Sequence, residues 1–504
     1  IIGPQVRTSL DNLSKSGSET TGAASANGLE ILAGFVDFRT DGTIKNAFSV
    51  SSNGGSTWSH LVVRPPAQYQ DNLEADPMTA YDPRTNTLFA GGISRAKCIY
   101  VAKKLPGQNA FTPSTVAVLS AWPDKGWMAA GPRPGMPNTT RLYVTYNEGI
   151  IWSDDLGTNW TPPLSLGTGF GFLPRVGPEG QLYLTYWDGY WGIKFTKSLD
   201  GGQTWSPVLQ PATRMQSWGV ENYGIPGTFR NFTNNTMTVN PANGDIVIFY
   251  VDQTNIVNGQ KNLDLYMVKS SDQGATWTDA ERLPFRPLNQ ISDMIFPWVE
   301  FTKDGRLHLF AMDTALNPDQ TDGASHGLWD QTYYYSDNSG VTWSSRFQLT
   351  PSAWDSFNEG SGASFLGDYQ GMAISDHAVW PVYPDTRTGQ AENYVNQISI
   401  PDNFILSLNK SSVAGQNSVL GTITMQETKA TNTVFTTYDN SSLVTTPSNV
   451  TVLAGQLSRS FQIMVTAITS TVVTTVYAKR GALTRSRILT LTPLVPTAMA
   501  FTPS

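Results

Sequence analysis

Acidic residues follow several short hydrophobic segments of this sequence, at positions where they could share acid–base chemistry. Other acids precede the inner strands on the same face, and the three that we predict to act together are among these: Glu74, Asp124 and Asp293. Two carboxylates roughly 5–10 Å apart divide into an acid and a base or nucleophile in glycoside hydrolysis. Because an acid after a strand is also a common turn former, a purely structural role is the alternative for each.

Arginines and aromatic residues near these acids would complete a carbohydrate site. Arginine binds a carboxylate or sulfate through two parallel hydrogen bonds, and aromatic rings stack on the faces of sugars. The predicted binding residues are Arg39, Arg95, Arg230, Arg387, Trp187, Trp191 and Tyr369. The alternative for Asp385-Thr386-Arg387 is a local ion pair.

A ring of carboxylates could instead hold a cation, and Ca²⁺ takes six to eight oxygen ligands. No contiguous Asp-x-Asp-x-Asp-Gly loop is present, and the four histidines lack metal-ligand spacing. The sequence also has no Gly-x-Ser-x-Gly elbow, phosphate-binding loop or Cys-x-x-Cys pair. We therefore predict no metal site and no required cofactor, with Ca²⁺ as the alternative.

The elements that would position these side chains recur along the chain. Each is a turn followed by a short hydrophobic strand that most often ends in an acid: 31–37, 88–94, 142–148, 182–188, 246–252, 307–313 and 379–385. Several alternate apolar and polar residues, as a half-buried strand does. Seven such units indicate an all-β, seven-bladed β-propeller, with residues 1–20 supplying a strand that closes the ring. The strand ends would then share one face with Asp76, Lys125 and Asp368.

A second repeat, Ser-x-Asp-x-Gly-x-Thr-Trp, occurs five times, with small variations. Its Asp or Asn can hydrogen-bond backbone amides two residues on, its Gly permits a positive φ, and its Trp can fill the hollow beneath the turn. We predict a structural role for Asn53, Asp155, Asp200, Asp272 and Asn338 and for Trp58, Trp160, Trp205, Trp277 and Trp343.

The composition changes at about residue 401. We assign residues 1–401 to the propeller and 402–494, with seven short Ser-, Thr- and Val-rich strand segments, to an immunoglobulin-like sandwich. Residues 495–504 resemble the opening of this second module, so we predict a linker and the first strand of a further repeat. That strand could add to the sheet of a neighbouring copy.

Charged residues make up only 14% of the chain, the net charge is −7, and no apolar run approaches the roughly 20 residues of a membrane span. This balance gives no support for binding nucleic acid. The single cysteine, Cys98, excludes an internal disulfide framework. We expect an extracellular or cell-surface protein whose leader has been removed, with N-glycosylation as an option at Asn12, Asn138, Asn159, Asn231, Asn234, Asn409, Asn440 and Asn449.

The five turns resemble the Asp-box (BNR) repeats of sialidase-like propellers, over roughly residues 20–400. This resemblance implies a propeller with the turns on its outer rim. Sialidases of this family use an arginine triad, a Tyr–Glu pair and an Asp acid/base, and usually carry an Arg-Ile-Pro string. Here Ile225-Pro226 is the nearest string and no arginine precedes it, and seven blades differ from their six. The C-terminal module resembles the Ig-like repeats of bacterial and archaeal surface proteins.

Two hypotheses on function follow from these features. The first is a secreted or cell-surface module that binds glycans, assembles with copies of itself, or both. The alternative is a glycoside hydrolase that acts on a polysaccharide or a terminal sugar through paired carboxylates on the propeller face.

Overall fold

The computed structural model describes residues 2–494 except 96, 191, 214–224, 228, 232–234, 242, 304, 363, 401–403, 426–427, 430 and 481–482. The chain divides into two compact units. The first is Ile1–Thr302 with Leu307–Ile400, and the second is Lys303–Arg306 with Pro401–Ser504. The described residues form strands and two short 3₁₀ turns, η1 (Ala67–Tyr69) and η2 (Ser356–Asn358), so the predicted all-β class is confirmed. No helix among them is both long and apolar enough to span a membrane.

Seven antiparallel sheets make up the described part of the first unit. The first sheet holds β2 (Ser14–Ala24), β3 (Ile31–Arg39), β4 (Ile44–Ser51) and β5 (Ser59–Val62). The second holds β6 (Glu74–Asp82), β7 (Thr87–Ser94), β8 (Cys98–Lys104) and β9 (Thr115–Leu119). The third holds β10 (Trp127–Arg133), β11 (Met136–Tyr146) and β12 (Gly149–Ser153). The fourth holds β13 (Phe170–Val176), β14 (Leu182–Trp187), β15 (Gly192–Ser198) and β16 (Leu209–Thr213).

The remaining three sheets of this unit follow the same order. The fifth holds β17 (Thr236–Val239), β18 (Ile246–Val257), β19 (Gln260–Ser270) and β20 (Glu281–Arg282). The sixth holds β21 (Met294–Phe301), β22 (Leu307–Asp313), β23 (Leu328–Ser336) and β24 (Phe347–Gln348), with β25 (Trp354–Asp355) also paired to β23. The seventh holds β26 (Gly371–Ile374), β27 (Ala378–Asp385), β28 (Glu392–Ser399) and β1 (Ile2–Arg7).

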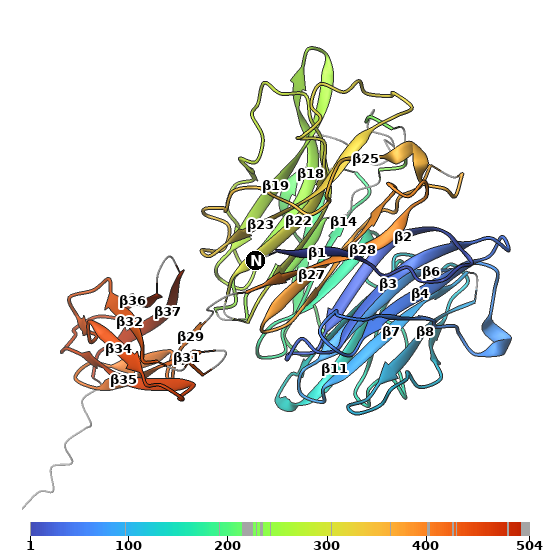
Figure 1. The fold of residues 1–504 in the computed structure, drawn as a ribbon. Helices are drawn as coiled ribbons and strands as arrows, with labels where there is room; N and C mark the ends of the chain where they lie inside the picture. Colours follow the sequence, from blue (N-terminus) through green and yellow to red (C-terminus); the bar gives the residue numbers. More distant parts are fainter. Residues whose placement is uncertain are drawn as a thin grey trace, which may run out of the picture. The chain divides into compact units, whose positions relative to one another are not determined.

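The inner strands of the seven sheets contact one another in a closed cycle. β2 contacts β6, and the contacts continue through β10, β13, β17, β21 and β26 back to β2. The seventh sheet joins both ends of the unit, because β1 pairs antiparallel with β28, with Ile2 opposite Ile398 (Figure 1). The predicted closing strand is therefore confirmed, and the N-terminal segment also supplies β2.

The hydrophobic segments of the sequence repeat all lie in second strands of these sheets. The third sheet is the exception to the four-strand plan, since only an isolated bridge from Ile150 to Leu164 follows β12. Pro162 and Pro163 precede Leu164. Proline lacks the N–H that a strand ladder needs, which explains why a full outer strand does not form there.

The Asp-box turns are held by a repeated set of hydrogen bonds. At the copy that begins with Ser198, the Ser198 Oγ accepts the Gly202 N–H at 2.7 Å and the Asp200 Oδ1 accepts the Thr204 N–H at 2.9 Å. Gly202 has φ of 100°, which a residue with a β carbon rarely adopts. In the fifth sheet, Trp277 packs edge-on against Phe195 of the fourth at 4.9 Å between ring centroids, so this turn also ties two sheets together.

The second unit contains two sheets in its described residues. One orders β29 (Phe404–Leu408), β31 (Ser418–Met425), β35 (Ser458–Val465) and β33 (Val444–Thr445). The other orders β30 (Ser412–Ala414), β37 (Leu483–Thr492), β36 (Val472–Arg480), β32 (Thr433–Asp439) and β34 (Asn449–Val452). Side chains of both sheets, including Phe404, Ile463 and Leu489, form one core. The predicted extra strand at 495–504 lies outside the described residues.

Candidate functional site

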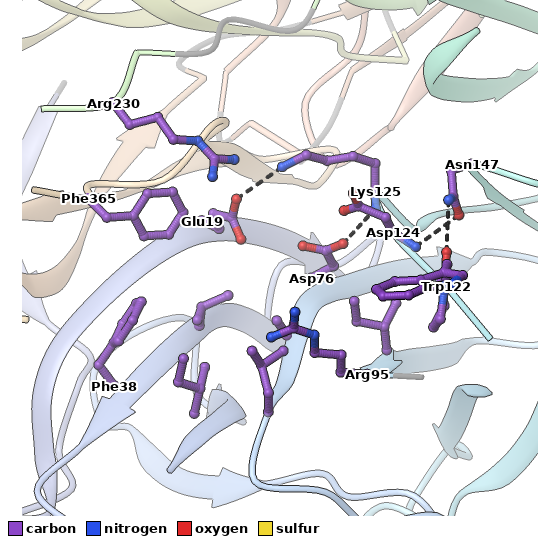
Figure 2. A pocket seen from close by; sticks show the side chains of 16 residues that line it. Glu19, Phe38, Asp76, Arg95, Trp122, Asp124, Lys125, Asn147, Arg230 and Phe365 are labelled. Atoms are coloured by element: carbon purple, nitrogen blue, oxygen red, sulfur yellow. Dashed lines mark hydrogen bonds and ion pairs between the residues drawn. The ribbon is translucent and has the colours of Figure 1, made fainter. Parts of the chain in front are cut away.

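A cavity of about 500 Å³ opens in the first unit, where the inner strands of the first three sheets begin (Figure 2). Side chains from β2, β3, β4, β6 and β7 and from the segment before β10 line it, together with Arg230 and Phe365. Its polar and aromatic lining residues are Glu19, Phe38, Asp76, Arg95, Trp122, Asp124, Lys125, Asn147, Arg230 and Phe365. We call this cavity the charged pocket.

Three of its charged residues lie two positions before the regular part of successive inner strands. Glu19, Asp76 and Lys125 have φ values of 46°, 51° and 50°, in the left-handed region that residues other than glycine rarely adopt. Strand register shifts at the first two, between Ser18 and Thr21 and between Ala75 and Met78. Such bulges re-aim a side chain at a cost of order 1–3 kcal/mol for each left-handed residue. The backbone is therefore shaped to present these charges to the pocket.

Lys125 is the centre of a buried charge network. Its Nζ lies 3.3 Å from the Glu19 Oε1 and also contacts Asp368, while its backbone N–H donates to the Asp76 Oδ2 at 2.6 Å. Arg230 donates from Nε to the Asp368 Oδ1 at 2.8 Å, and its guanidinium lies 5.0 Å from the Phe365 ring centroid. The network thus neutralises both cations within the protein.

The pKa values of this network follow from burial and from neighbouring charges. Burial raises the pKa of Asp76 well above its usual value, and the charge of Glu19 adds to the shift. Burial also raises the pKa of Glu19, against the opposing effect of Lys125. Burial alone would lower the pKa of Lys125, but Asp368, Glu19 and the other nearby acids outweigh it and raise that pKa.

The open side of the pocket is formed by a short segment that is fastened to the turn after β11. Asn147 donates from Nδ2 to the Trp122 carbonyl at 2.8 Å and accepts the Asp124 N–H on Oδ1 at 3.0 Å. Its own N–H donates to the Asp124 carbonyl at 3.1 Å. Trp122 is 66% exposed and lines the pocket, although its backbone is held by Ser120 and Asn147. Trp122 is therefore a positioned, solvent-facing aromatic surface.

Three of the predicted site residues meet in the charged pocket: Arg95, Asp124 and Arg230. Glu74 and Asp293 do not line it. Glu74 is buried and accepts from Arg64, with Nη2 to Oε1 at 2.7 Å and Nε to Oε2 at 3.0 Å. Asp293 is buried and accepts the Leu263 N–H at 2.9 Å, and burial raises its pKa to about 7.

The other predicted binding residues lie elsewhere. Arg39 and Arg387 form ion pairs with strand-end acids, to Asp37 at 2.8 Å and to Asp385 at 2.7 Å. Tyr369 is buried behind the pocket, beneath the Lys125 ammonium at 5.5 Å from its ring centroid. Trp187 is buried and donates from Nε1 to the Tyr190 carbonyl at 3.0 Å. Trp191 lies outside the described residues. The strand-end acids Asp37 and Asp385 thus form ion pairs with their neighbouring arginines. The ligand-binding roles of Arg39, Arg387, Tyr369 and Trp187 stay predictions.

The pocket residues that the sequence did not single out include Glu19 and Trp122, together with Phe38, Asn147 and Phe365. A usable signal existed for Glu19. It precedes the regular part of its inner strand by the same two residues as Asp76 before Met78 and Lys125 before Trp127. Trp122 has no comparable signal, since its exposure depends on how Asn147 holds the segment.

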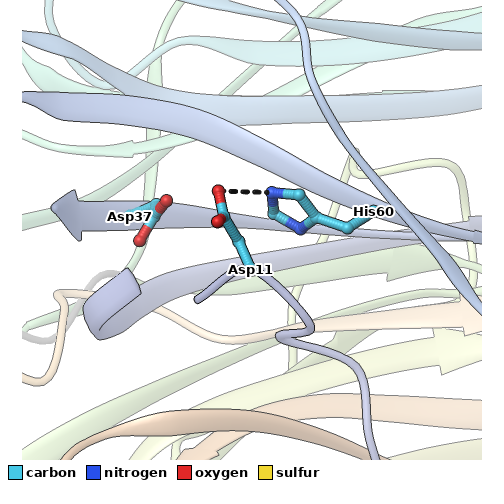
Figure 3. A group of neighbouring side chains, drawn as sticks. All are labelled: Asp11, Asp37 and His60. Atoms are coloured by element: carbon cyan, nitrogen blue, oxygen red, sulfur yellow. Dashed lines mark ion pairs between the residues drawn. The ribbon is translucent and has the colours of Figure 1, made fainter. Parts of the chain in front are cut away.

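A second group of acids is the candidate for a cation. Ligand atoms of Asp11, Asp37 and His60 lie within 4.8 Å of one another (Figure 3). The Arg39 Nη1, however, donates to the Asp11 Oδ2 at 2.7 Å and to the Asp37 Oδ2 at 2.8 Å. The guanidinium already supplies the positive charge there, and these three side chains offer few of the oxygens that Ca²⁺ takes. The residues therefore do not fit a Ca²⁺ site.

The sequons differ in exposure. Asn12, Asn138, Asn159, Asn409, Asn440 and Asn449 are exposed, whereas Asn231 is fully buried and inaccessible to an attached glycan in the folded unit. Asn234 lies outside the described residues.

Comparisons with known proteins agree with the repeat that the sequence carries. The model of the BNR repeat-like domain family matches residues 192–358. This stretch contains the Asp-boxes that begin at Ser198, Ser270 and Ser336. The predicted resemblance to BNR repeats is confirmed over this part of the chain. No curated protein matches the sequence.

Several solved structures are similar to the chain at low identity. A Hadza microbial sialidase, Hz136, is 17% identical, with 79% of this chain and 68% of that one covered and a TM-score of 0.40. The intramolecular trans-sialidase from Ruminococcus gnavus is 12% identical, covering 78% and 97%, with a TM-score of 0.39. The BP39L lectin from Burkholderia pseudomallei is 14% identical, covering 77% and 99%, with a TM-score of 0.43.

Proposed function

We propose that the chain is a glycan-binding protein that works outside the cell or at its surface, and that the charged pocket is its binding site. In this proposal the first unit is a seven-bladed β-propeller and the second an Ig-like sandwich. The closed cycle of seven inner strands supports the former, and the two sheets around one core support the latter.

The observation that carries the binding proposal is the rim of the pocket. Trp122 exposes a flat apolar ring beside the carboxylate of Asp124 and the guanidinium of Arg95. A pyranose needs an apolar surface for one face and hydrogen-bonding groups for its hydroxyls. Binding sites for small ligands combine these features: apolar or aromatic walls and a few fixed polar groups.

The direct test compares glycan binding by the full chain and by Trp122→Ala on a glycan panel, with affinities from calorimetry. We expect the substitution to weaken binding at least about tenfold, which corresponds to about 1.4 kcal/mol. Tyr190→Ala is the matched control, because Tyr190 is 69% exposed and lies away from the pocket lining. Equal affinities for the Trp122 variant and the wild type would contradict the proposal.

Glycoside hydrolysis is the second candidate, and Asp76 is the observation that favours it. Burial raises the pKa of Asp76 well above its usual value, the direction that favours a general acid, and Glu19 lines the same pocket. Product analysis on every glycan that binds separates the two functions. Turnover that Asp76→Asn abolishes, with binding retained, would establish an enzyme, whereas binding without product supports binding alone.

Self-assembly through residues 495–504 is a further part of the proposal, although these residues lie outside the described part of the chain. Light scattering of the full chain and of a form that ends at residue 494 tests it. We expect the full chain to form oligomers and the shortened form to contain fewer copies per particle. If both forms are monomers, strand donation is excluded.

A further inference from the structure

We infer that the charged pocket selects an uncharged sugar over a carboxylated or sulfated one. The inference rests on the proposed glycan binding and concerns the ligand class of the same pocket. It follows from which charged side chains of the pocket are paired with other protein groups and which are available to a ligand.

Two of the three cations that line the pocket are bound to Asp368. Lys125 contacts Asp368 and Glu19, and Arg230 donates to Asp368 from both Nε and Nη2. Asp368 is fully buried, and the side chains of Lys125 and Glu19 are only 4% and 5% exposed. Lys125 could bind a ligand carboxylate only by leaving Asp368 and Glu19, which would take a cation away from buried acids, whereas the charge of the 45% exposed Arg230 side chain is already balanced by Asp368. Breaking a buried pair in this way costs about 3–5 kcal/mol.

The side chains that remain available carry both signs. Within the described residues, neither the Arg95 guanidinium nor the Asp124 carboxylate makes a side-chain hydrogen bond or an ion pair, and both line the pocket. Arg95 can donate to sugar hydroxyls, and Asp124 can accept from them. For an anionic ligand, the attraction of Arg95 is opposed by Asp124, which lines the same pocket, since like charges repel.

The pocket therefore matches a ligand that presents several hydroxyls and one apolar face. Trp122 supplies the surface for the apolar face, and Asn147 fixes the segment that carries both Trp122 and Asp124. A volume of about 500 Å³ lies within the usual range of roughly 300–1,000 Å³ for pockets that take small ligands.

The test uses pairs of oligosaccharides that differ only in whether the terminal residue is a neutral hexose or is capped by a carboxylated sugar. Calorimetry with the full chain should give at least about tenfold tighter binding for the neutral member of a pair. That affinity should change less than about twofold between about 50 mM and about 500 mM NaCl, because no ligand charge is available for salt to screen.

Variants at the two available side chains complete the test. Asp124→Ala should weaken binding of the neutral sugar about tenfold, while Asp124→Asn, which still accepts a hydrogen bond, should lose about threefold or less. Tighter, salt-sensitive binding of the carboxylated member, lost in Arg95→Ala, would overturn this inference and leave glycan binding intact. Failure of both members to bind across the panel would overturn the proposed function itself.

Discussion

Aspartate occurs both in the Asp-box turns and in the charged pocket, but the two surroundings shift its pKa in opposite directions. Asp272 accepts hydrogen bonds from the side chain and the backbone of Thr276, and these bonds lower its pKa to about 2. Asp76 is buried beside another acid, and its pKa is raised well above its usual value. The turn stabilises a carboxylate in contact with water, whereas the pocket holds an acid whose charge is disfavoured. Structural aspartates and candidate functional ones are thus distinguished by their surroundings and not by the motif.

The largest effect is expected for Lys125→Met, which removes the buried cation from the charge network. Glu19 and Asp368 would lose a partner, and we expect the free energy of unfolding to fall by about 3–5 kcal/mol in denaturant melts. Lys15→Met is the control, because Lys15 is exposed, and it should change stability little. An equal fall in the free energy of unfolding in both variants would show that the buried charge network does not stabilise the fold.

A smaller effect, dependent on pH, is expected at Asp293. Because the pKa of Asp293 is about 7 when folded and near 3.9 in an unfolded chain, the folded state retains a proton that the unfolded state releases. Its contribution to stability is full below about pH 4 and is lost as pH rises through about 7. Asp293→Asn keeps an acceptor for the Leu263 N–H, so it should be more stable than wild type at about pH 8 and show a flatter pH profile in thermal melts. Parallel profiles would contradict this assignment.

The Asp-box prediction is that Asp272→Ala destabilises the protein by about 1–2 kcal/mol, because it removes the acceptor for the Ala275 and Thr276 amides and for the Thr276 hydroxyl. Asp272→Asn should cost less, since Asn338 accepts the Thr342 N–H in the corresponding turn at 2.8 Å. Denaturant melts of both variants measure the difference. An Asn variant as unstable as the Ala variant would show that the charge, and not the acceptor, is what matters.

The smallest effect is expected for Asn147→Ala, which removes the side-chain hydrogen bonds that hold the segment of Trp122 and Asp124. Glycan affinity should weaken about threefold while the unfolding midpoint stays close to that of wild type. Calorimetry and thermal melts on one preparation give both values. Unchanged affinity would mean that Trp122 does not need this support.

The elements of the fold could be predicted from the sequence because they depend on local patterns. Alternation in segments such as 142–146 and 182–186 marks second strands, and the Asp-box fixes the turn after the third strand. The pocket could not be predicted in full, because its charges converge through backbone geometry that no pattern records. Glu74 and Asp76 lie two residues apart, yet Glu74 is bound to Arg64, while the left-handed bulge turns Asp76 into the pocket.

The pairing of β1 with β28 determines how the first unit responds to mechanical load. The strands run antiparallel, so the start of β1 at Ile2 and the end of β28 near Ile398 lie at the same end of the pair. Tension between these two ends loads the hydrogen bonds of the pair one after another, as in opening a zipper, and not all together in shear. The seventh sheet is consequently the place where a pulled chain would begin to open.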